Sequence, residues 1–167
     1  MLNILHHYIG TKILNRIEPE ISHAIALCYL RLLNQFVKKR KIGNPMLKTK
    51  ICGMEVPSPI GLAAGFDKNA EVFNATLSLG FGFVEVGTIT PDPQFGNPKP
   101  RLFRLPEEKA LINRMGFNNK GMLYVSKIAE KPKLGIVGVN IGANAKSINK
   151  ILDYTNIFEF IAHLFDY

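Results

Sequence analysis

The sequence predicts an α/β fold, which we interpret as the N-terminal portion of a (β/α)8 barrel preceded by a two-helix extension. Short apolar runs alternate with amphipathic helical segments after residue 48, a pattern typical of a parallel sheet covered by helices. Polar and glycine-rich clusters follow the apolar runs, and barrel enzymes collect their chemistry at such strand ends. The dinucleotide-binding pattern G-x-G-x-x-G does not follow the first strand, which disfavours an open doubly wound sheet.

A complete barrel requires about 200 residues or more. Only about 120 residues follow the two predicted helices, which is enough for three strands and their helices. A partial barrel leaves sheet edges unpaired and one face of its core uncovered. We therefore expect the barrel to be incomplete within these 167 residues.

Two short amphipathic helices are predicted in residues 1–42, ahead of a linker at Gly43-Asn44-Pro45. Leucine and isoleucine recur every three or four residues in 1–17, which predicts one apolar stripe. Pro19 suits the first turn of a second helix over residues 19–37. The apolar side of this second helix comprises Ile21, Ile25, Cys28, Leu32 and Phe36. The pair is either a hairpin packed on its own domain or an element whose apolar face enters a bilayer.

Positive charge is concentrated at the start of the chain. Residues 1–50 contain nine Lys or Arg against two Glu, and so carry +7 of the formal net charge of +8. The nearly neutral remainder disfavours a nucleic-acid-binding protein, whereas a basic amphipathic segment, ending in the run Lys38–Lys41, favours a membrane surface or an anionic partner. No run approaches the ~20 apolar residues of a transmembrane helix, and no secretory signal is recognisable, so we expect an intracellular protein.

Residues 43–167 are predicted to form one domain of strands and helices. Continuous apolar runs such as PIGLAA, FVEVGT and LGIVGVNI indicate buried strands, and apolar residues at helical spacing indicate the helices between them. Gly80 is well placed to end the first of these helices. The expected elements are a hairpin (48–52 with 54–56), strand 59–64, helix 69–79, strand 83–88, a hairpin (101–105 with 110–114), helix 119–130, strand 134–141 and helix 154–165.

Neither cysteine nor histidine forms a recognisable metal or disulfide pattern. Cys28 and Cys52 have no metal-ligand spacing, and we expect both to be reduced residues of the core. The four histidines are scattered, and no metal site is predicted.

Three strand ends carry residues suited to ligand chemistry. In Gly61–Gly65 the small side chains allow a flat ligand to approach the backbone, and Lys68 supplies a cation beside it. Beside a flavin, such a cation would stabilise the reduced ring. Thr88 offers a hydroxyl after the second strand, and Asn140 offers an amide at the third. Each could also be an ordinary turn residue, and Lys68 could be a solvated lysine of a tight turn.

The stretch Leu111–Asn119 contains three asparagines around a glycine. Amide groups are paired donors and acceptors, which match a ligand with amide edges such as a pyrimidine ring. The alternative is an asparagine-rich loop that caps the following helix.

Four ordered blocks of the sequence resemble the class 2, quinone-reducing dihydroorotate dehydrogenases. The blocks are PIGLAAGFDKNAE (Pro59–Glu71), GFGFVEVGTITPDPQFGNPKPRLFRL (Gly80–Leu105), LINRMGFNNKG (Leu111–Gly121) and GVNIGAN (Gly138–Asn144). The segment Glu18-Pro19-Glu20 with His23 is also similar to the start of that family, and the basic helix pair distinguishes class 2 from the shorter soluble class 1.

This resemblance implies a (β/α)8 TIM barrel with FMN at its mouth and a helical extension, residues 1–42, through which quinone reaches the flavin. Dihydroorotate would be oxidised to orotate in pyrimidine biosynthesis, with ubiquinone or menaquinone as the acceptor. The implied FMN contacts are Ala64, Gly65, Phe66, Asp67, Lys68, Thr88 and Asn140. The implied substrate contacts are Lys68, Asn113, Arg114, Met115, Gly116 and Phe117.

The family's general base is a serine in a block that would follow Tyr167. We therefore expect no catalytic base within the chain and no activity of the chain alone. Three alternatives follow: half of an enzyme completed by a C-terminal chain, an inactive truncated remnant, or a membrane-surface module. The resemblance further implies a peripheral location on the cytoplasmic side of the cell membrane or on an inner organellar membrane.

Overall fold

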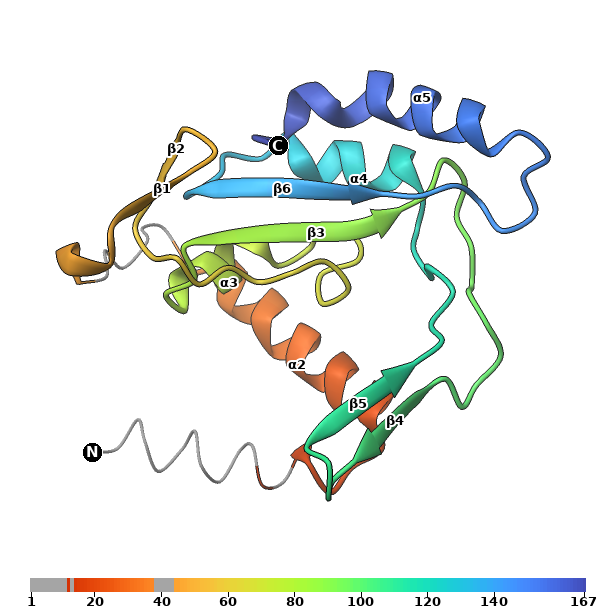
Figure 1. Ribbon diagram of the computed structural model, residues 1–167, viewed down its shortest axis with the longest axis horizontal. Coiled ribbons are helices and arrows are strands. Elements are labelled where there is room, and N and C mark those ends of the chain that lie inside the picture. The colour runs from red at the N-terminus through yellow and green to blue at the C-terminus, as the bar shows by residue number, and fades with distance from the viewer. Residues whose placement is uncertain (1–11, 13, 38–43) are drawn as a thin grey trace.

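The computed structural model describes residues 12, 14–37 and 44–167 (Figure 1). Most of the predicted first helix and the basic run Lys38–Lys41 lie outside the described residues. The fold is mixed α/β and is organised around two parallel strands, β3 (Phe83–Ile89) and β6 (Ile136–Ile141). Figure 1 shows α4 and α5 along β6 and α3 along β3, with α2 next to α3.

The two strands and two short flanking segments lie side by side in chain order. Main-chain hydrogen bonds join Leu62 to β3, with its N–H 3.1 Å from the oxygen of Phe83. β3 pairs with β6 in a parallel register from Phe83 opposite Ile136 to Val86 opposite Val139. Beyond β6, the N–H of Val139 donates to the oxygen of Tyr167 at 3.0 Å. This order is the one that successive right-handed strand–helix units produce.

The prediction of a regular strand at 59–64 is wrong. Only Leu62 forms a bridge to β3, although Ile60 and Gly65 also take part in main-chain hydrogen bonds nearby. Pro59 has no N–H to donate, and its position at the edge of the sheet leaves the segment with a partner on one side only.

The other predicted strands and hairpins are confirmed. β1 (Thr49–Ile51) pairs with β2 (Met54–Val56), and β4 (Leu102–Leu105) pairs with β5 (Ala110–Asn113), both antiparallel. Short 3-10 turns lie at Pro45–Leu47 and Ala162–Leu164.

The helices form where they are predicted, but their ends differ. α2 spans Pro19–Asn34, and the side chain of Glu18 caps its first turn. α3 (Phe73–Ser78) and α4 (Met122–Ala129) begin three to four residues later than expected because a loop precedes each of them. α5 (Lys150–Ile161) begins earlier, since the side chain of Asn149 accepts a hydrogen bond from Leu152 and starts the helix there.

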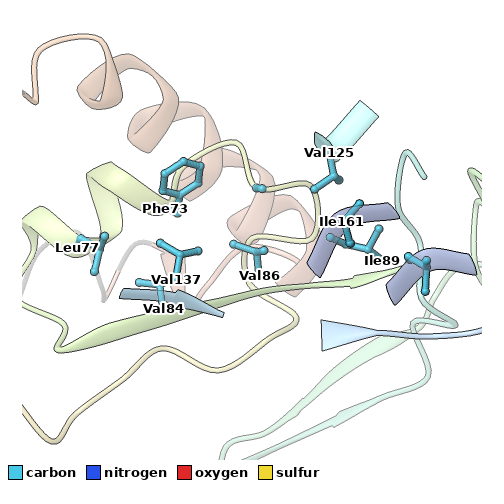
Figure 2. Close-up of a cluster of buried hydrophobic side chains, with 10 residues drawn as sticks. Phe73, Leu77, Val84, Val86, Ile89, Val125, Val137 and Ile161 are labelled. Carbon is cyan, nitrogen blue, oxygen red and sulfur yellow. The ribbon is translucent and has the colours of Figure 1, made fainter. Parts of the chain in front are cut away.

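The main core lies between the helices and one face of the β3–β6 pair. Alternate residues of the strands point into it, so that Val84, Val86 and Val137 are fully buried. Figure 2 shows these side chains facing the apolar residues of the helices. The helix residues in this core are Phe73, Leu77, Val125, Ile157 and Ile161. A smaller cluster of Leu30, Val72 and Ala75 attaches α2 to α3.

The apolar stripe predicted on the second helix faces solvent. Ile21, Ile25, Leu32 and Phe36 are between 45% and 77% exposed, because α2 packs on its domain through Leu30 instead. Both cysteines are free, as expected, but the prediction that they belong to the core is wrong. Cys28 lies on an exposed part of α2, and Cys52 occupies the β1–β2 turn with a φ of 49°. In the described part of the chain, no helix is long and apolar enough to cross a membrane.

Replacing Leu77 with alanine is expected to lower the free energy of unfolding by about 2–5 kcal/mol. Leu77 is fully buried between α3 and β3, so the substitution leaves a cavity that the neighbours fill only in part. Urea unfolding followed by circular dichroism measures the change. Leu152→Ala, at a side chain 51% exposed on α5, is the matched control and is expected to change stability by less than about 1 kcal/mol.

Candidate functional site

The three polar clusters predicted at strand ends meet at one end of the sheet. We call residues 65–72 the Lys68 loop and residues 113–119 the Asn113 loop. The N–H of Gly65 donates to the oxygen of Gly87 at 2.7 Å, which places the Lys68 loop beside the end of β3. The hydroxyl of Thr88 donates to Oδ1 of Asn140 at 2.6 Å and so joins the ends of β3 and β6.

A cavity of about 620 Å³ opens between these strand ends, α2 and the β4–β5 hairpin. Most of the predicted site residues line it: Ala64, Gly65, Phe66, Lys68, Thr88, Asn113, Met115, Gly116 and Phe117. Asn140 lies just behind Thr88, through the hydrogen bond described above. Asp67 and Arg114 are the two predicted residues that neither line the cavity nor contact a lining side chain through their own side chains.

The cavity also has lining residues that the sequence analysis did not assign: Pro19, Ser22, His23, Leu102, Arg104 and Leu111. They belong to α2 and to the β4–β5 hairpin, which are distant in sequence from the strand ends. His23 and Arg104 lie in segments that resemble the family, and apart from this resemblance nothing in the sequence pattern indicated that they line a site.

Lys68 is half-buried at the cavity, and its ammonium donates to the oxygen of Gly65 at 2.5 Å. Burial lowers the pKa of Lys68 below its usual value, and the nearby cation of Arg101 lowers it further. A lysine held in this way is less well hydrated than a surface lysine. An anionic or electron-rich ligand can therefore bind the ammonium group by displacing only the few water molecules that still hydrate it.

Asp67 has a structural role in the Lys68 loop. Its carboxylate is almost fully buried and accepts hydrogen bonds from the N–H groups of Glu71 and Val72, each at 2.8 Å. These bonds close the loop and hold the chain where α3 begins. Burial raises the pKa of Asp67 to about 6, in spite of the two hydrogen bonds that favour its ionised form.

The raised pKa of Asp67 predicts a loss of stability with increasing pH. The folded state binds the proton more tightly than the unfolded chain, so the contribution of Asp67 falls between about pH 4 and pH 6, by about 3 kcal/mol for a rise from 3.8 to about 6. Asp67→Asn does not titrate. The difference in unfolding free energy between wild type and Asp67→Asn, measured in urea at pH 4 and pH 7, is therefore expected to shift in favour of Asn at pH 7. An unchanged difference would contradict this account.

The Asn113 loop is held from behind by residues 94–97. The side chain of Asn97 donates to the oxygen of Arg114 at 2.7 Å, and that of Gln94 donates to the oxygen of Gly116 at 3.0 Å. Gly116 has a φ of 71°, and a Cβ there would lie 2.8 Å from the nitrogen of Asn97, so only glycine fits. With its outer side fixed, the loop presents Asn113 and Phe117 to the cavity.

Arg114 is turned away from the cavity. Its guanidinium donates to the oxygen of Pro100 at 2.9 Å, which ties the Asn113 loop to the start of β4. We assign it a role in holding the loop.

α2 contributes Pro19, Ser22 and His23 to the wall of the cavity. Nε2 of His23 lies 2.7 Å from the oxygen of Phe66, so this nitrogen carries the proton and donates to the Lys68 loop. Burial lowers the pKa of His23, and the nearby cation of Lys68 lowers it further, which favours the neutral ring. Arg104 donates to the oxygen of Leu14 at 3.0 Å and also to the oxygen of Ile17. These contacts fix the start of α2 on the hairpin.

The backbone of the Lys68 loop leaves room for a flat ring. Gly65 has a φ of 104°, and a Cβ built there would meet no protein atom within 4 Å. The main chain at Gly65 is therefore open to the cavity that Lys68 and Thr88 also line. A planar heterocycle with polar edges fits these residues, with the cation and the Thr88–Asn140 pair at its edge and Phe117 as a further lining residue.

Parallel strands whose carboxyl ends gather a cation, amides and an open glycine backbone are the arrangement in which α/β enzymes place their ligand sites. The model of the dihydroorotate dehydrogenase family matches residues 46–167. The chain belongs to the dihydroorotate dehydrogenase family.

Relatives named dihydroorotate dehydrogenase (quinone) match almost the whole chain. The protein of Mesorhizobium japonicum is 50% identical over 148 residues, which are 87% of this chain and 41% of the relative. The protein of Rhodopseudomonas palustris strain HaA2 is 49% identical over 157 residues, 93% of this chain and 43% of the relative. The chain thus spans less than half the length of these relatives.

Solved structures agree with this assignment. A ligand-free DHODH of Eimeria tenella superposes with a TM-score of 0.79 at 38% identity, over 89% of this chain and 44% of that one. The same enzyme in complex with ferulenol gives a TM-score of 0.78 at 38% identity.

Proposed function

We propose that these residues form the flavin- and substrate-facing part of a quinone-reducing dihydroorotate dehydrogenase, which oxidises dihydroorotate to orotate. The observation that carries the proposal is the convergence of Lys68, Thr88 and the Asn113 loop on one cavity. The names of the relatives supply the substrate and the acceptor. Because the chain spans less than half of those relatives, the proposal concerns the whole enzyme to which these residues contribute.

We further propose the first part of a (β/α)8 barrel, residues 43–167, preceded by a helical extension, residues 1–42. The support is the chain-order arrangement of Leu62, β3, β6 and Tyr167, in which β3 and β6 are parallel, since a barrel is built from neighbouring parallel strands in this order. On the other side of β6, the N–H of Asp166 donates to the oxygen of Val137, and the N–H of Val139 donates to the oxygen of Tyr167.

FMN is the proposed cofactor, and when bound it would take two electrons from dihydroorotate and pass them to quinone. Gly65 would allow the ring to lie against the main chain, and Thr88 and Asn140 would contact its polar edge. The cation of Lys68 would hold the substrate carboxylate and stabilise negative charge on the reduced ring. The Asn113 amide would pair with the amide edge of the dihydropyrimidine ring.

The described residues that line the cavity leave the general base unassigned. The hydroxyl of Thr88 donates to Asn140, and that of Ser22 donates to the oxygen of Leu14 at 2.7 Å. Neither is placed next to a group that would accept its proton during catalysis. We propose that the base is a serine outside these 167 residues, supplied by the remainder of the barrel, for example by a complementary C-terminal chain.

Quinone, either ubiquinone or menaquinone, is proposed to enter between α2 and the hairpin, where Pro19 and Leu102 line the same cavity as Gly65. The exposed apolar stripe of α2 supports contact with a membrane surface, which would place the protein peripherally on the membrane. This stripe also favours a second candidate function, a membrane-surface module without turnover.

Steady-state turnover distinguishes these two functions. The chain is co-expressed with the part of the Mesorhizobium japonicum relative that follows the matched residues, and dihydroorotate oxidation is followed with a soluble quinone. We expect quinone-dependent turnover from the assembled protein and none from the chain alone. Sedimentation with anionic vesicles at low and high salt reports the membrane contact separately. Vesicle binding combined with an assembled, flavin-loaded protein that shows no turnover would favour the surface module.

A further inference from the structure

The Glu71 carboxylate joins separate segments of the chain behind the Lys68 loop. Its Oε1 accepts hydrogen bonds from Nζ of Lys120 and from the hydroxyl of Tyr124, each at 2.7 Å. Its Oε2 accepts from Nε of Arg31 at 3.1 Å. Arg31 belongs to α2 and Tyr124 to α4, so a single side chain connects the loop to both helices. The Glu71 side chain is only 9% exposed, which shields these contacts from solvent screening.

The same network connects the Lys68 loop to the Asn113 loop. Lys120 directly follows the Asn113 loop, and its N–H donates to Oδ1 of Asn69 at 2.9 Å. On the other side of Lys68, the N–H of Glu71 donates to Asp67. Both chain neighbours of Lys68 therefore accept from main-chain N–H groups of Glu71 and Lys120, the two residues that the carboxylate joins.

The charges of this network favour the ionised carboxylate. Burial opposes ionisation of Glu71, but the hydrogen bonds from Lys120, Tyr124 and Arg31 outweigh it and hold its pKa below the usual value. The hydrogen bond to Glu71 in turn raises the pKa of Lys120. At neutral pH the carboxylate therefore accepts from two cations and one phenol, an arrangement that an uncharged amide reproduces only in part.

Glu71 does not line the cavity, so any effect on the ligand acts through its neighbours. We propose that Glu71 is a positioning residue that holds the Lys68 loop in register with the Asn113 loop and with α2. Lys68 and Asn113 then face the same ligand at a fixed separation. The identity of that ligand rests on the proposed function, whereas the contacts of Glu71 do not.

Hydrogen exchange of the chain tests the positioning directly. In Glu71→Gln we expect amides of residues 65–71 and 113–120 to exchange about tenfold faster, while β3 and β6 keep their protection. Glu71→Asp keeps the charge on a shorter side chain. Its loop amides are expected to exchange at rates between those of wild type and Glu71→Gln. Glu55→Gln, at the exposed ion pair with Lys48, is the control and should leave both loops unchanged. Equal loop exchange in wild type and Glu71→Gln, or faster exchange throughout the chain, would overturn the proposal.

Kinetics of the assembled, flavin-loaded enzyme separate positioning from general destabilisation. We expect Glu71→Gln to lower kcat/KM for dihydroorotate about 10- to 100-fold for each bound flavin, because a displaced Lys68 no longer matches the substrate. A purely structural role would reduce the amount of folded protein and leave kcat/KM for each flavin unchanged, and that result would overturn the proposal. Failure of the proposed function would instead show as a wild-type enzyme without turnover, while the exchange pattern would still decide the role of Glu71.

Discussion

Lys68→Ala is expected to lower kcat/KM for dihydroorotate about 10- to 100-fold in the assembled enzyme. Lys68 is a cation of the cavity wall, and one hydrogen bond to a charged group contributes about 1.5–3 kcal/mol. The loss arises because neither Gly65 nor Thr88 carries a positive charge, and the guanidinium of Arg104 is already engaged by the oxygens of Leu14 and Ile17. Steady-state rates, normalised to bound flavin, measure the effect.

Lys127→Ala is the matched control for this prediction, because Lys127 lies on the exposed face of α4, away from the cavity. It should leave kcat/KM within about twofold of wild type. An equal effect of the two substitutions would show that Lys68 acts through net charge alone and would contradict its assignment to the site.

Arg101→Met is expected to lower the free energy of unfolding by about 3–5 kcal/mol, since it leaves the shielded carboxylate of Glu20 with only the exposed Lys99, 3.5 Å away, as a partner. The guanidinium donates to Glu20 at 2.6 Å, and the two side chains are only 7% and 14% exposed. It also donates to the oxygens of Phe95 and Asn97, which the substitution leaves without this donor. Urea unfolding at pH 7 provides the measurement.

The Glu20–Arg101 pair also has a pH signature opposite to that of Asp67. The hydrogen bond from Arg101 holds the pKa of Glu20 below its usual value, against the effect of burial. The stabilisation is therefore present above about pH 4.5 and is lost as the pH falls through the lowered pKa.

Lys48→Met is the control for Arg101→Met. It removes the Lys48–Glu55 pair, whose side chains are 60% and 55% exposed, and should lower the free energy of unfolding by no more than about 1 kcal/mol. A comparable cost for both substitutions would contradict the distinction between shielded and exposed pairs.

Local sequence patterns were sufficient for the elements that depend on periodicity and turn residues. β3 and β6 are continuous apolar runs, and α2 begins at Pro19 with a capping glutamate, so both types of element could be placed from neighbouring residues. The family blocks then indicated that Lys68, Thr88 and the Asn113 loop belong together, and the cavity brings these residues to one place.

Features that depend on distant contacts could not be obtained in this way. The late start of α3 follows from Asp67, which satisfies backbone groups of Glu71 and Val72 and thereby keeps the chain in a loop. The contact of His23 with Phe66 spans 43 residues of sequence and joins two elements that no periodicity relates. Cys28 illustrates the same limit. The helical spacing of the apolar residues of α2 could be recognised in the sequence. The side of the helix that packs on the domain could not, and Cys28 is exposed.

Single-turnover reduction of bound FMN tests the central claim most directly, namely that this cavity faces both the flavin and dihydroorotate. The chain assembled with the remainder of the Mesorhizobium japonicum relative is mixed anaerobically with dihydroorotate while the visible flavin absorbance is recorded. The account predicts bleaching of the flavin in the wild-type assembly, and slower bleaching in Lys68→Ala by the factor given above. A flavin-loaded assembly whose absorbance does not respond to dihydroorotate, or responds equally with and without Lys68, would contradict it.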